Sequence, residues 1–292
     1  MPEIGNNIAN ADINLVDEAF DASKSGSYHL SMQIETGRLS FCVFNTANKK
    51  YIALRSYPIS FSSQHTSLFN VFHPIFENDS LFRLRYKSSS LLWMTPRCTL
   101  VPEHLFDPDK GGLHLTFNQG AVAGEHILHY FIRSIHSCCV FSCPKEMTAL
   151  VRMYQPNIHF FHQLTPFIEP AVTKTPPADN AEVTVLFYSP WLDVAVVKEN
   201  KLLFYNSFKI NAPADSVYYL AGISNLFDID LKSANIMYAG NLKQMPPEVA
   251  ILKDFTGNIV ECHSSNAFTY SHYITEPFRR DFLNLFNLYR CE

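Results

Sequence analysis

Two segments of the chain, about 150 residues apart, share one succession of apolar and polar residues, and this internal repeat limits the fold more than any other feature. The segments are 33–59 and 185–210. In each, β-branched and aromatic residues alternate along two strands joined by a tight turn, and a polar turn then leads into a third strand. Each segment therefore predicts a meander of three strands.

A helical pattern follows each meander. Residues 63–76 place apolar side chains at helical spacing behind serines, and residues 214–227 repeat the pattern after Pro213, which suits the first turn of a helix. Because the repeat unit is about 150 residues long, it predicts two similar lobes and not a solenoid of short repeats. Strands interleaved with helices in both halves indicate the α/β class.

The boundary between the lobes is predicted from composition. Two prolines and several polar residues make 174–180 the best linker. We therefore expect a flexible N-terminal segment (1–25), a first lobe (26–173), the linker and a second lobe (181–292). The first lobe is expected to add strands near 90–95, 126–135, 138–142 and 158–161, a Gly-rich turn at 111–112 and a helix at 144–154. The second is expected to add strands at 235–239 and 258–262 and helices at 247–255 and 276–289.

Composition excludes several classes of protein. A chain of 292 residues with 47% hydrophobic residues can bury a core, and its net charge of −4 lacks the basic surplus of a nucleic-acid binder. No stretch approaches the ~18 apolar residues of a membrane span, and the acidic N-terminus does not read as a secretory signal. The chain has seven cysteines, and this odd number indicates reduced thiols and not a framework of disulfides. We expect a soluble, cytoplasmic protein without a nucleic-acid or membrane partner.

The chain resembles the actin-like ATPase fold of sugar kinases, Hsp70 and actin. It is most similar to an uncharacterised bacterial domain-of-unknown-function family that is assigned this fold. The resemblance covers nearly the whole chain beyond residue 25 and rests on HLSMQIETGRLSFCVF with KKYIALRSYPI, on DVAVVKENKLLFYNSFKI with ADSVYYL, and on the ending FLNLFNLYRCE. It implies two ribonuclease H-like lobes, each opening with a three-strand meander followed by helices, and no established activity.

The resemblance also implies where a nucleotide would bind. Active members hold phosphates on Gly-bearing strand turns, because only a backbone without Cβ approaches phosphate oxygens closely, and they hold Mg²⁺ with carboxylates. The first equivalent turn, 35–38, keeps Gly37 between Glu35 and Arg38. The second, 188–191, has neither Asp nor Gly, and the third, 237–241, keeps only Gly240. No GxxxxGK[ST] or GxGxxG loop replaces them.

These residues have two interpretations. Glu35 and Gly37 form an ordinary hairpin turn with a solvated charge, or they keep a residual contact with a nucleotide or anion beside Arg38. Gly240 is a loop glycine at a strand end, or part of the same residual site. Asp193 is the only carboxylate near the second turn, and strand alternation leaves its direction open. We expect no bound cofactor, with ATP and Mg²⁺ as the alternative.

A group of potential metal ligands lies within eighteen positions: His126, His129, His136, Cys138, Cys139 and Cys143. Structural zinc needs paired ligand units, and only Cys139 with Cys143 approaches that spacing. On a strand these two thiols share a face, which favours core positions. His159 and His162 indicate a partly buried strand end, with a pair of metal ligands as the alternative. We expect no metal site.

The abundant aromatic residues are expected to fill the core for the most part, and some to meet a partner. Trp191, Tyr218 and Tyr219 border the expected cleft and are the candidates for contact with a protein. No G-x-S-x-G motif and no helix-opening cysteine indicates a nucleophile, so we expect no catalytic residue. The preferred function is a non-catalytic pseudo-ATPase scaffold or regulatory module. The alternatives are an active ATPase or kinase with a modified interlobe site, and a sensor that binds a small molecule in an aromatic cleft.

Overall fold

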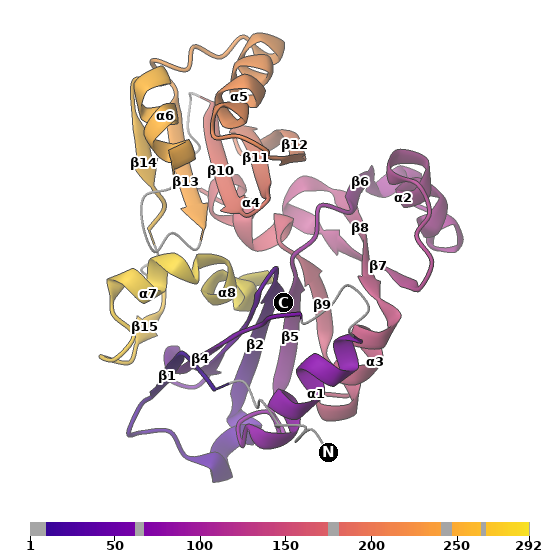
Figure 1. Cartoon of the computed structure of the whole chain (residues 1–292), viewed down its shortest axis with the longest axis vertical. Helices are drawn as coiled ribbons and strands as arrows, with labels where there is room; N and C mark the ends of the chain where they lie inside the picture. The colour runs from indigo at the N-terminus through magenta and orange to yellow at the C-terminus, as the bar shows by residue number, and fades with distance from the viewer. Residues whose placement is uncertain (1–9, 62–66, 175–180, 241–246, 264–266, 292) are drawn as a thin grey trace, which may run out of the picture.

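The computed structural model describes residues 10–61, 67–174, 181–240, 247–263 and 267–291. Within these ranges the chain forms two lobes, each built around one sheet, and a smaller third sheet lies beside the first lobe (Figure 1). Lobe 1 holds the seven-stranded sheet and lobe 2 the five-stranded sheet. This arrangement confirms the α/β fold with two lobes.

The sheet of lobe 1 begins with the predicted meander. Its strands are β1 (Ile13–Val16), β2 (Tyr28–Glu35), β3 (Arg38–Asn45), β4 (Lys50–Pro58), β5 (Ser88–Trp93), β9 (His159–His162) and β15 (Thr269–Tyr270). Their order is β1-β4-β3-β2-β5-β9, with β15 paired to β4. Strands β2, β3 and β4 are antiparallel, whereas β5 runs parallel to β2 and β9 parallel to β5.

The sheet of lobe 2 has the same plan. Its strands are β10 (Glu182–Tyr188), β11 (Trp191–Lys198), β12 (Lys201–Lys209), β13 (Asn235–Gly240) and β14 (Ile259–Glu261). The order β12-β11-β10-β13-β14 matches β4-β3-β2-β5-β9, with the same antiparallel meander and the same two parallel strands. The register even shifts between the second and third meander strands of each lobe, at Val43/Phe44 and at Val196/Val197. Both predicted meanders are confirmed.

The helices cover these sheets in corresponding places. They are α1 (Leu68–Asn78), α2 (Gly111–Gln119), α3 (Lys145–Tyr154), α4 (Leu164–Val172), α5 (Ala214–Phe227), α6 (Pro247–Phe255), α7 (Glu276–Asp281) and α8 (Leu283–Asn287). Helix α1 packs beside α3 on lobe 1, and α5 beside α6 on lobe 2. Of the predicted helix 63–76, residues 63–66 lie outside the described ranges. None of the described helices is long and apolar enough to cross a membrane.

The third sheet is an insertion between β5 and α3. It contains β6 (Cys98–Pro102), β7 (Glu125–Ile132) and β8 (Ser137–Pro144) in the order β6-β8-β7, and α2 packs on it. The predicted Gly-rich turn at 111–112 is wrong, because these glycines begin α2 directly after the 3-10 turn Pro108–Lys110. Gly111 is buried against the ring of Phe106. Tertiary packing here outweighs the low helix propensity of glycine.

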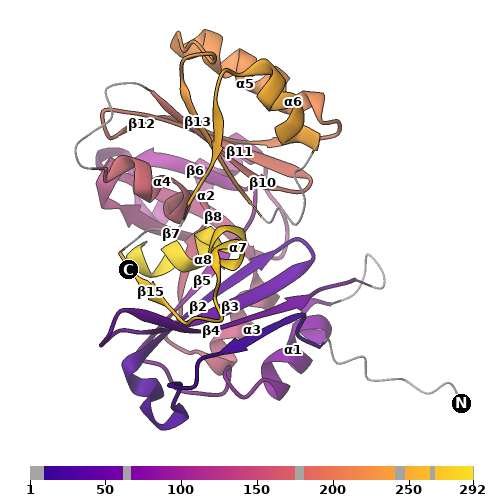
Figure 2. The ribbon, with the colours of Figure 1, turned by 90° about the vertical axis from the view of Figure 1, so that its left-hand side faces the viewer.

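After β14 the chain returns to lobe 1. Strand β15 pairs with β4, and α7 and α8 lie between the lobes (Figures 1 and 2). Phe282, Leu285 and Phe286 pack with Phe44 and Tyr51 of the lobe 1 sheet. Within 267–291, β15 and α8 therefore pack on lobe 1 although they follow lobe 2 in the chain, whereas α7 also contacts β13 of lobe 2. The linker within 174–180 stays our proposed point of the first crossing. Residues 175–180 lie outside the described ranges.

The predicted single helix over 276–289 is wrong in its continuity. Phe282 leaves the helical conformation (φ −112°, ψ 30°) and separates α7 from α8. This break turns the Phe282 ring into the lobe 1 cluster, where it is buried. The predicted apolar face of this segment is confirmed, since Leu285 and Phe286 are buried in the same cluster.

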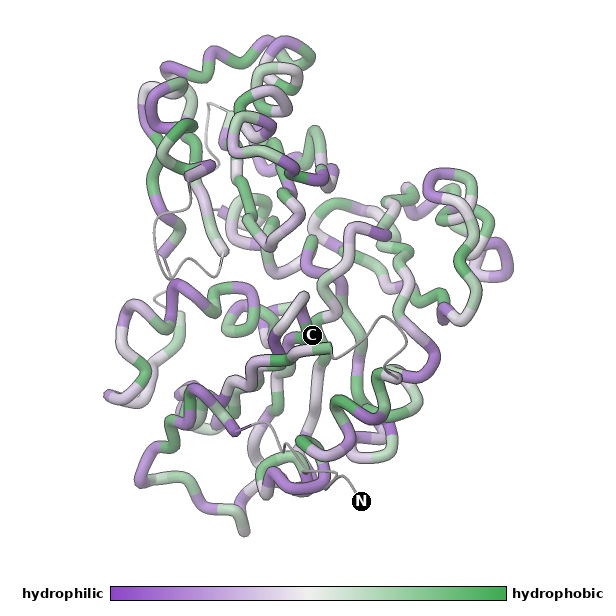
Figure 3. The backbone as a smooth tube through the Cα atoms, in the orientation of Figure 1, coloured by the Kyte–Doolittle hydropathy of each residue, from purple (hydrophilic) through white to green (hydrophobic). Residues whose placement is uncertain are grey.

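Hydrophobic and hydrophilic residues alternate along both lobes and do not separate into one polar and one apolar half (Figure 3). Lobe 2 has its own cluster, which includes Val194, Leu220 and Ile236. The larger cluster of lobe 1 also takes in Leu186 and Ala239 from lobe 2. The two lobes therefore share buried apolar surface at the place where the candidate site lies.

Candidate functional site

The first predicted phosphate turn is an ordinary hairpin between β2 and β3. Gly37 has φ +79°, a conformation that favours glycine, and its carbonyl accepts the backbone N–H of Ile59 at 2.8 Å. The guanidinium of Arg38 donates to both carboxylate oxygens of Asp12, at 2.9 and 3.1 Å, and to the hydroxyl of Ser56. Arg38 is therefore held toward β1 and β4.

Gly240 ends β13, opposite Phe187 of β10. Its φ is +138°, and a Cβ at this position would lie 2.4 Å from the carbonyl oxygen of Phe187. The close approach of two parallel strands thus explains why glycine occupies this position. No phosphate is needed to account for it.

Glu35 and Gly240 do come together. They line one cavity between the lobes, with Gln33 and Phe187, whereas Gly37 and Arg38 do not line it. Its remaining lining residues come from the end of β5, from β10 and β13 and from the C-terminal helices: Met94, Leu186, Ala239, Arg280, Asp281, Leu283 and Asn284. The cavity measures about 20 Å³. That volume suits one water molecule, far less than a nucleotide needs.

The polar atoms of this cavity agree with its size. Among the described residues, the side-chain oxygens Oε1 of Gln33 and Oδ1 of Asn284 are buried without a hydrogen-bond partner. The guanidinium of Arg280 lies 3.0 Å from the carboxylate of Glu261 and 3.4 Å from that of Asp281. The positive charge nearest to the cavity is thus matched by two carboxylates of the protein itself.

The second turn, between β10 and β11, contains a cis Ser189–Pro190 peptide. Just beyond it, Asp193 of β11 points inward and is completely buried. Its Oδ1 accepts the hydroxyl of Tyr188 at 2.7 Å, and its Oδ2 accepts that of Tyr205 at 2.6 Å. Burial raises the pKa of Asp193 to about 6, although hydrogen bonds to its carboxylate oppose the rise.

Gln163, the residue before α4, connects this carboxylate to lobe 1. Its Nε2 lies 3.1 Å from Oδ2 of Asp193, 3.0 Å from the hydroxyl of Tyr188 and 2.8 Å from the carbonyl of Thr95. Its Oε1 accepts the backbone N–H of Thr95 at 3.1 Å. Thr95 follows β5, so one buried amide side chain joins the two lobes.

The sequence pattern does not predict this network. It leaves the orientation of the Asp193 side chain open and contains no signal for Gln163. One signal was present: Asp193 is the only charged residue in the otherwise apolar run of β11 before Lys198. Buried groups with a shifted pKa are frequent in functional sites, which makes Asp193 and Gln163 candidates.

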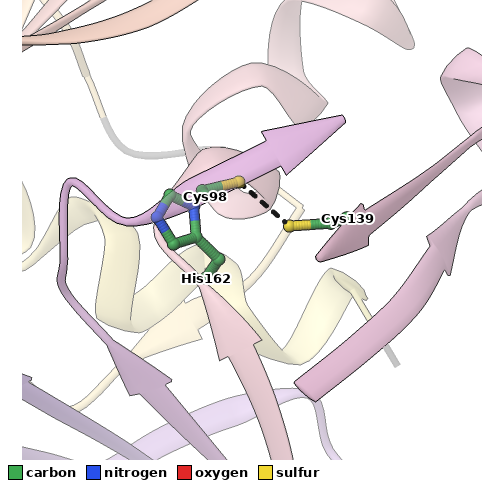
Figure 4. Close-up of side chains that lie close together, drawn as sticks. All are labelled: Cys98, Cys139 and His162. Atoms are coloured by element: carbon green, nitrogen blue, oxygen red, sulfur yellow. Dashed lines mark hydrogen bonds between the residues drawn. The ribbon is translucent and has the colours of Figure 1, made fainter. Parts of the chain in front are cut away.

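In the described chain, two groups of side chains could offer three ligand atoms to a metal ion: the partly exposed Asp17, Glu18 and His272, and the largely buried Cys98, Cys139 and His162 (Figure 4). Their ligand atoms lie within 4.8 Å of one another, and the two Sγ atoms are 3.4 Å apart. However, Nε2 of His162 donates to the carbonyl of Thr95 at 2.7 Å, and Nδ1 accepts the N–H of Leu164 at 3.2 Å. Both imidazole nitrogens are occupied, so the group does not fit a metal ion.

The pKa shifts of these side chains also disfavour a metal ion at this cluster. Burial lowers the pKa of His162 to about 4, which keeps the ring neutral, and raises the pKa of the Cys98 thiol well above its usual value. Of the residues considered as metal ligands from the sequence, Cys139 and His162 join this cluster. The others do not: His126, His129, His136, Cys138, Cys143 and His159. The thiols of Cys138, Cys139 and Cys143 are buried, as expected for core positions.

A much larger cleft lies between the third sheet and lobe 2. Its volume is about 690 Å³, and it is lined by Pro96, Arg97, Cys98, Thr99, Leu100, Asn118, Gln119, Trp191, Tyr205, Asn206 and Ser207. Trp191 is half-buried in its wall, and Tyr205 connects the cleft to Asp193. Arg97 is bound within its own lobe by Glu125 at 3.0 Å and by the carbonyls of Gln119 and Gly120.

The other two aromatic candidates lie elsewhere, on α5 of lobe 2. Tyr218 is 75% exposed, whereas Tyr219 stacks on Phe208 with ring centroids 4.3 Å apart. Neither lines the cleft that contains Trp191. The structure therefore separates the three predicted interaction residues into two surfaces.

Comparison with known proteins agrees with the two-lobed architecture. The model of the family described as "Protein of unknown function (DUF3822)" matches residues 17–259, and the chain therefore belongs to this family. No curated protein sequence matches the chain.

Two solved structures show the fold. A protein from Bacteroides thetaiotaomicron with an actin-like ATPase fold and unknown function superposes with a TM-score of 0.81 at 20% identity, over 94% of this chain and 99% of that one. A structure of the PilM–PilN type IV pilus biogenesis complex gives a TM-score of 0.57 at 12% identity, over 90% of this chain and 98% of the other. At these identities the likeness shows the actin-like fold alone.

Proposed function

We propose that this DUF3822 protein is a cytoplasmic pseudo-ATPase: it keeps the actin-like fold, lacks nucleotide chemistry and acts as a scaffold or regulatory module for another protein. The observation that carries the proposal is the cavity shared by Glu35 and Gly240, which measures about 20 Å³. Ligand sites for small molecules occupy roughly 300–1,000 Å³. Arg280 and Asp281 of α7 and Leu283 and Asn284 of α8 line this small cavity, which supports the proposal.

The buried network between the lobes supports the same proposal. Exchange of a nucleotide enclosed between two lobes requires the lobes to open. Here the side-chain amide of Gln163 would have to give up its buried hydrogen bonds to Tyr188 and Asp193 each time. Breaking such bonds without replacement costs about 1–3 kcal/mol for each buried group. A closed, stable pair of lobes is what a binding platform needs.

A protein partner is consistent with a solved complex that contains a protein of the same fold. One solved structure with the same fold is that of a complex, PilM with PilN. Exposed aromatic residues such as Tyr218 offer a surface for such contacts on this chain.

The test is a thermal-unfolding titration with ATP or ADP and Mg²⁺. A site saturated 100-fold above its dissociation constant stabilises the native state by about 2.7 kcal/mol, which raises the melting temperature measurably. We expect no shift at millimolar nucleotide and no release of phosphate above the protein-free rate. A saturable shift accompanied by hydrolysis would contradict the proposal.

The alternative function is an ATPase or kinase with a modified site around Glu35, Gly37, Arg38 and Gly240. If a nucleotide shift occurs, the variant Gly37→Asp tests this site, because Asp tolerates positive φ and places a negative charge in the turn. Loss of the shift would locate the nucleotide at this turn. Gly240 is unsuitable for the test because a Cβ there would collide with Phe187.

The cleft of about 690 Å³ beside Trp191 favours a second candidate function, that of a small-molecule sensor. The chain has only two tryptophans, so ligand screening can be followed by tryptophan fluorescence. A ligand of the cleft would change the emission of the wild type, and Trp191→Phe would remove that change. A ligand that also stabilises the protein would favour the sensor over the scaffold.

A further inference from the structure

The third sheet and the lobe 1 sheet each present a terminal strand to the same groove. Strand β7 is an outer strand of the order β6-β8-β7, and β9 is an outer strand of the lobe 1 sheet. In the described part of the chain, β7 has no further backbone partner on its outer side. The groove between them has a volume of about 620 Å³.

The lining of this groove shows that it runs along strand edges. Successive residues of a strand point to opposite faces, so a pocket on one face would be lined by every second residue. Here every residue from 128 to 134 and every residue from 158 to 161 lines the groove. The backbones of β7 and β9 therefore lie along its walls, where an extended chain could pair with them.

The side chain of Tyr130 on β7 connects this strand to β9 and to α4. Its hydroxyl is 2.6 Å from Oγ1 of Thr165 on α4, and it accepts the backbone N–H of His162 at 3.2 Å. Its ring packs edge-on against Phe161, with centroids 4.9 Å apart. These contacts fix the spacing of the two strand edges, so the groove exists before any partner binds.

The side chains that line the groove carry more positive than negative charge. Arg133, Arg152 and Arg290 line it, and in the described chain none of the three has a carboxylate within 4.0 Å. The one acidic residue in the lining, Glu169, accepts the hydroxyl of Ser134 at 3.1 Å. Phe131 adds an aromatic ring that is 49% exposed.

We propose that the groove between β7 and β9 binds an acidic, extended segment of a partner protein, which adds a strand to the edge of β7. Backbone hydrogen bonds supply the pairing, the arginines select acidic side chains, and Phe131 takes an apolar side chain between them. Strand β7 has eight residues, so at about 3.3 Å per residue it accepts a segment of about six to eight. The inference rests on the proposed scaffold function and names its docking surface.

The test begins with a displayed library of random eight-residue segments, selected on the full chain without nucleotide. We expect enrichment of segments in which Asp or Glu alternates with aliphatic or aromatic residues. An enriched segment is then synthesised with a fluorescent label, and its affinity is measured by anisotropy. Absence of enrichment, or enrichment of neutral or basic segments, would overturn the proposal.

Two matched variants locate the site. Arg133→Glu with Arg152→Glu reverses two charges of the groove, and we expect at least tenfold weaker binding of the labelled peptide. Arg83→Glu with Arg85→Glu makes the same change of net charge at exposed positions outside the groove, and we expect affinity within twofold of the wild type. Equal affinity of the wild type and the groove variant would refute the assigned surface.

Hydrogen exchange tests the strand addition itself. We expect the bound peptide to slow exchange of amides in Glu125–Ile132, and protection confined to other segments would contradict pairing along β7. The outcome is separable from that of the nucleotide titration. Hydrolysis of ATP would remove the pseudo-ATPase proposal and leave peptide binding intact, whereas a chain inert to both nucleotide and peptides would remove this inference alone.

Discussion

The side-chain amide of Gln163 in lobe 1 and the carboxylate of Asp193 in lobe 2 lie 3.1 Å apart, completely buried. Asp193 also accepts hydrogen bonds from the hydroxyls of Tyr188 and Tyr205. Gln163 also exchanges two hydrogen bonds with the backbone of Thr95. The contact joins the residue before α4 in lobe 1 to β11 in lobe 2. It makes the stability of the protein depend on the protonation of one aspartate.

The first prediction concerns pH. The pKa of Asp193 is raised from 3.8 to about 6, so the native state holds a proton that the unfolded chain has already released between these values. The free energy of unfolding contributed by this group therefore falls as the pH rises from about 4 to about 6, by about 3 kcal/mol, and then levels off. Urea denaturation from pH 4 to 7 measures it.

Asp193→Asn provides the comparison, because the amide does not titrate. We expect the difference in unfolding free energy between wild type and variant to change by about 3 kcal/mol over this range. Other carboxylates affect both proteins equally and cancel in the difference. Parallel curves for the two proteins would show that the carboxylate is already ionised throughout.

The second prediction concerns the link between the lobes. Gln163→Met keeps the volume of the side chain but leaves the backbone N–H of Thr95 and one oxygen of Asp193 with one partner fewer. We expect a loss of about 1–3 kcal/mol in unfolding free energy and faster hydrogen exchange at the start of α4.

The control for this change is Gln119→Met. The amide of Gln119 donates to the carbonyl of Cys98 at 2.8 Å, within one lobe. It should lower stability without loosening the lobes, so small-angle scattering should report an unchanged radius of gyration. A larger radius for the Gln119 variant than for the Gln163 variant would argue against Gln163 as the link.

The third prediction separates strand packing from ligand binding at the glycines. Gly240→Ala should cost about 3 kcal/mol or more, because its Cβ meets a carbonyl oxygen at 2.4 Å and its φ is +138°. Gly37→Ala has room and should cost about 1 kcal/mol for its positive φ alone. Gly26→Ala, with nothing within 4 Å, should change stability by less than about 0.5 kcal/mol. Thermal denaturation orders the three variants.

The fourth prediction concerns the C-terminal segment. Phe286 is 1% exposed, and its carbonyl accepts the hydroxyl of Tyr51. Phe286→Ala should lower the unfolding free energy by about 3–5 kcal/mol through the cavity it leaves. Phe117→Ala, at a position 91% exposed, should be nearly neutral. Equal losses for both variants would mean that the segment is not part of the cooperative core.

Much of the fold was predictable because its signals are local. Alternation at period two marked both meanders, and helical spacing after Pro213 marked α5 at its observed bounds, Ala214–Phe227. The two glycines at 111–112 wrongly predicted a turn, because the burial of Gly111 against Phe106 outweighs the low helix propensity of glycine. Periodicity also missed the break at Phe282, because an apolar stripe continues across it.

The candidate site was less accessible to prediction. Glu35 and Gly240 were placed together through the family resemblance, and they do share a cavity. The sequence carried no indication that α7 and α8 line that cavity, since the segment 267–291 contacts a sheet formed more than 200 residues earlier. Nor could strand alternation alone decide that Asp193 points inward.

By itself, then, the sequence determined the α/β class, the repeated meanders and the degraded turns, because these depend on residues that are neighbours in the chain. The tertiary structure alone decided the small size of the cavity, the occupied imidazole of His162 and the contact of Gln163 with Asp193. Each of these joins segments that are far apart in the chain, and their contacts exist only after both lobes and the C-terminal helices have packed together.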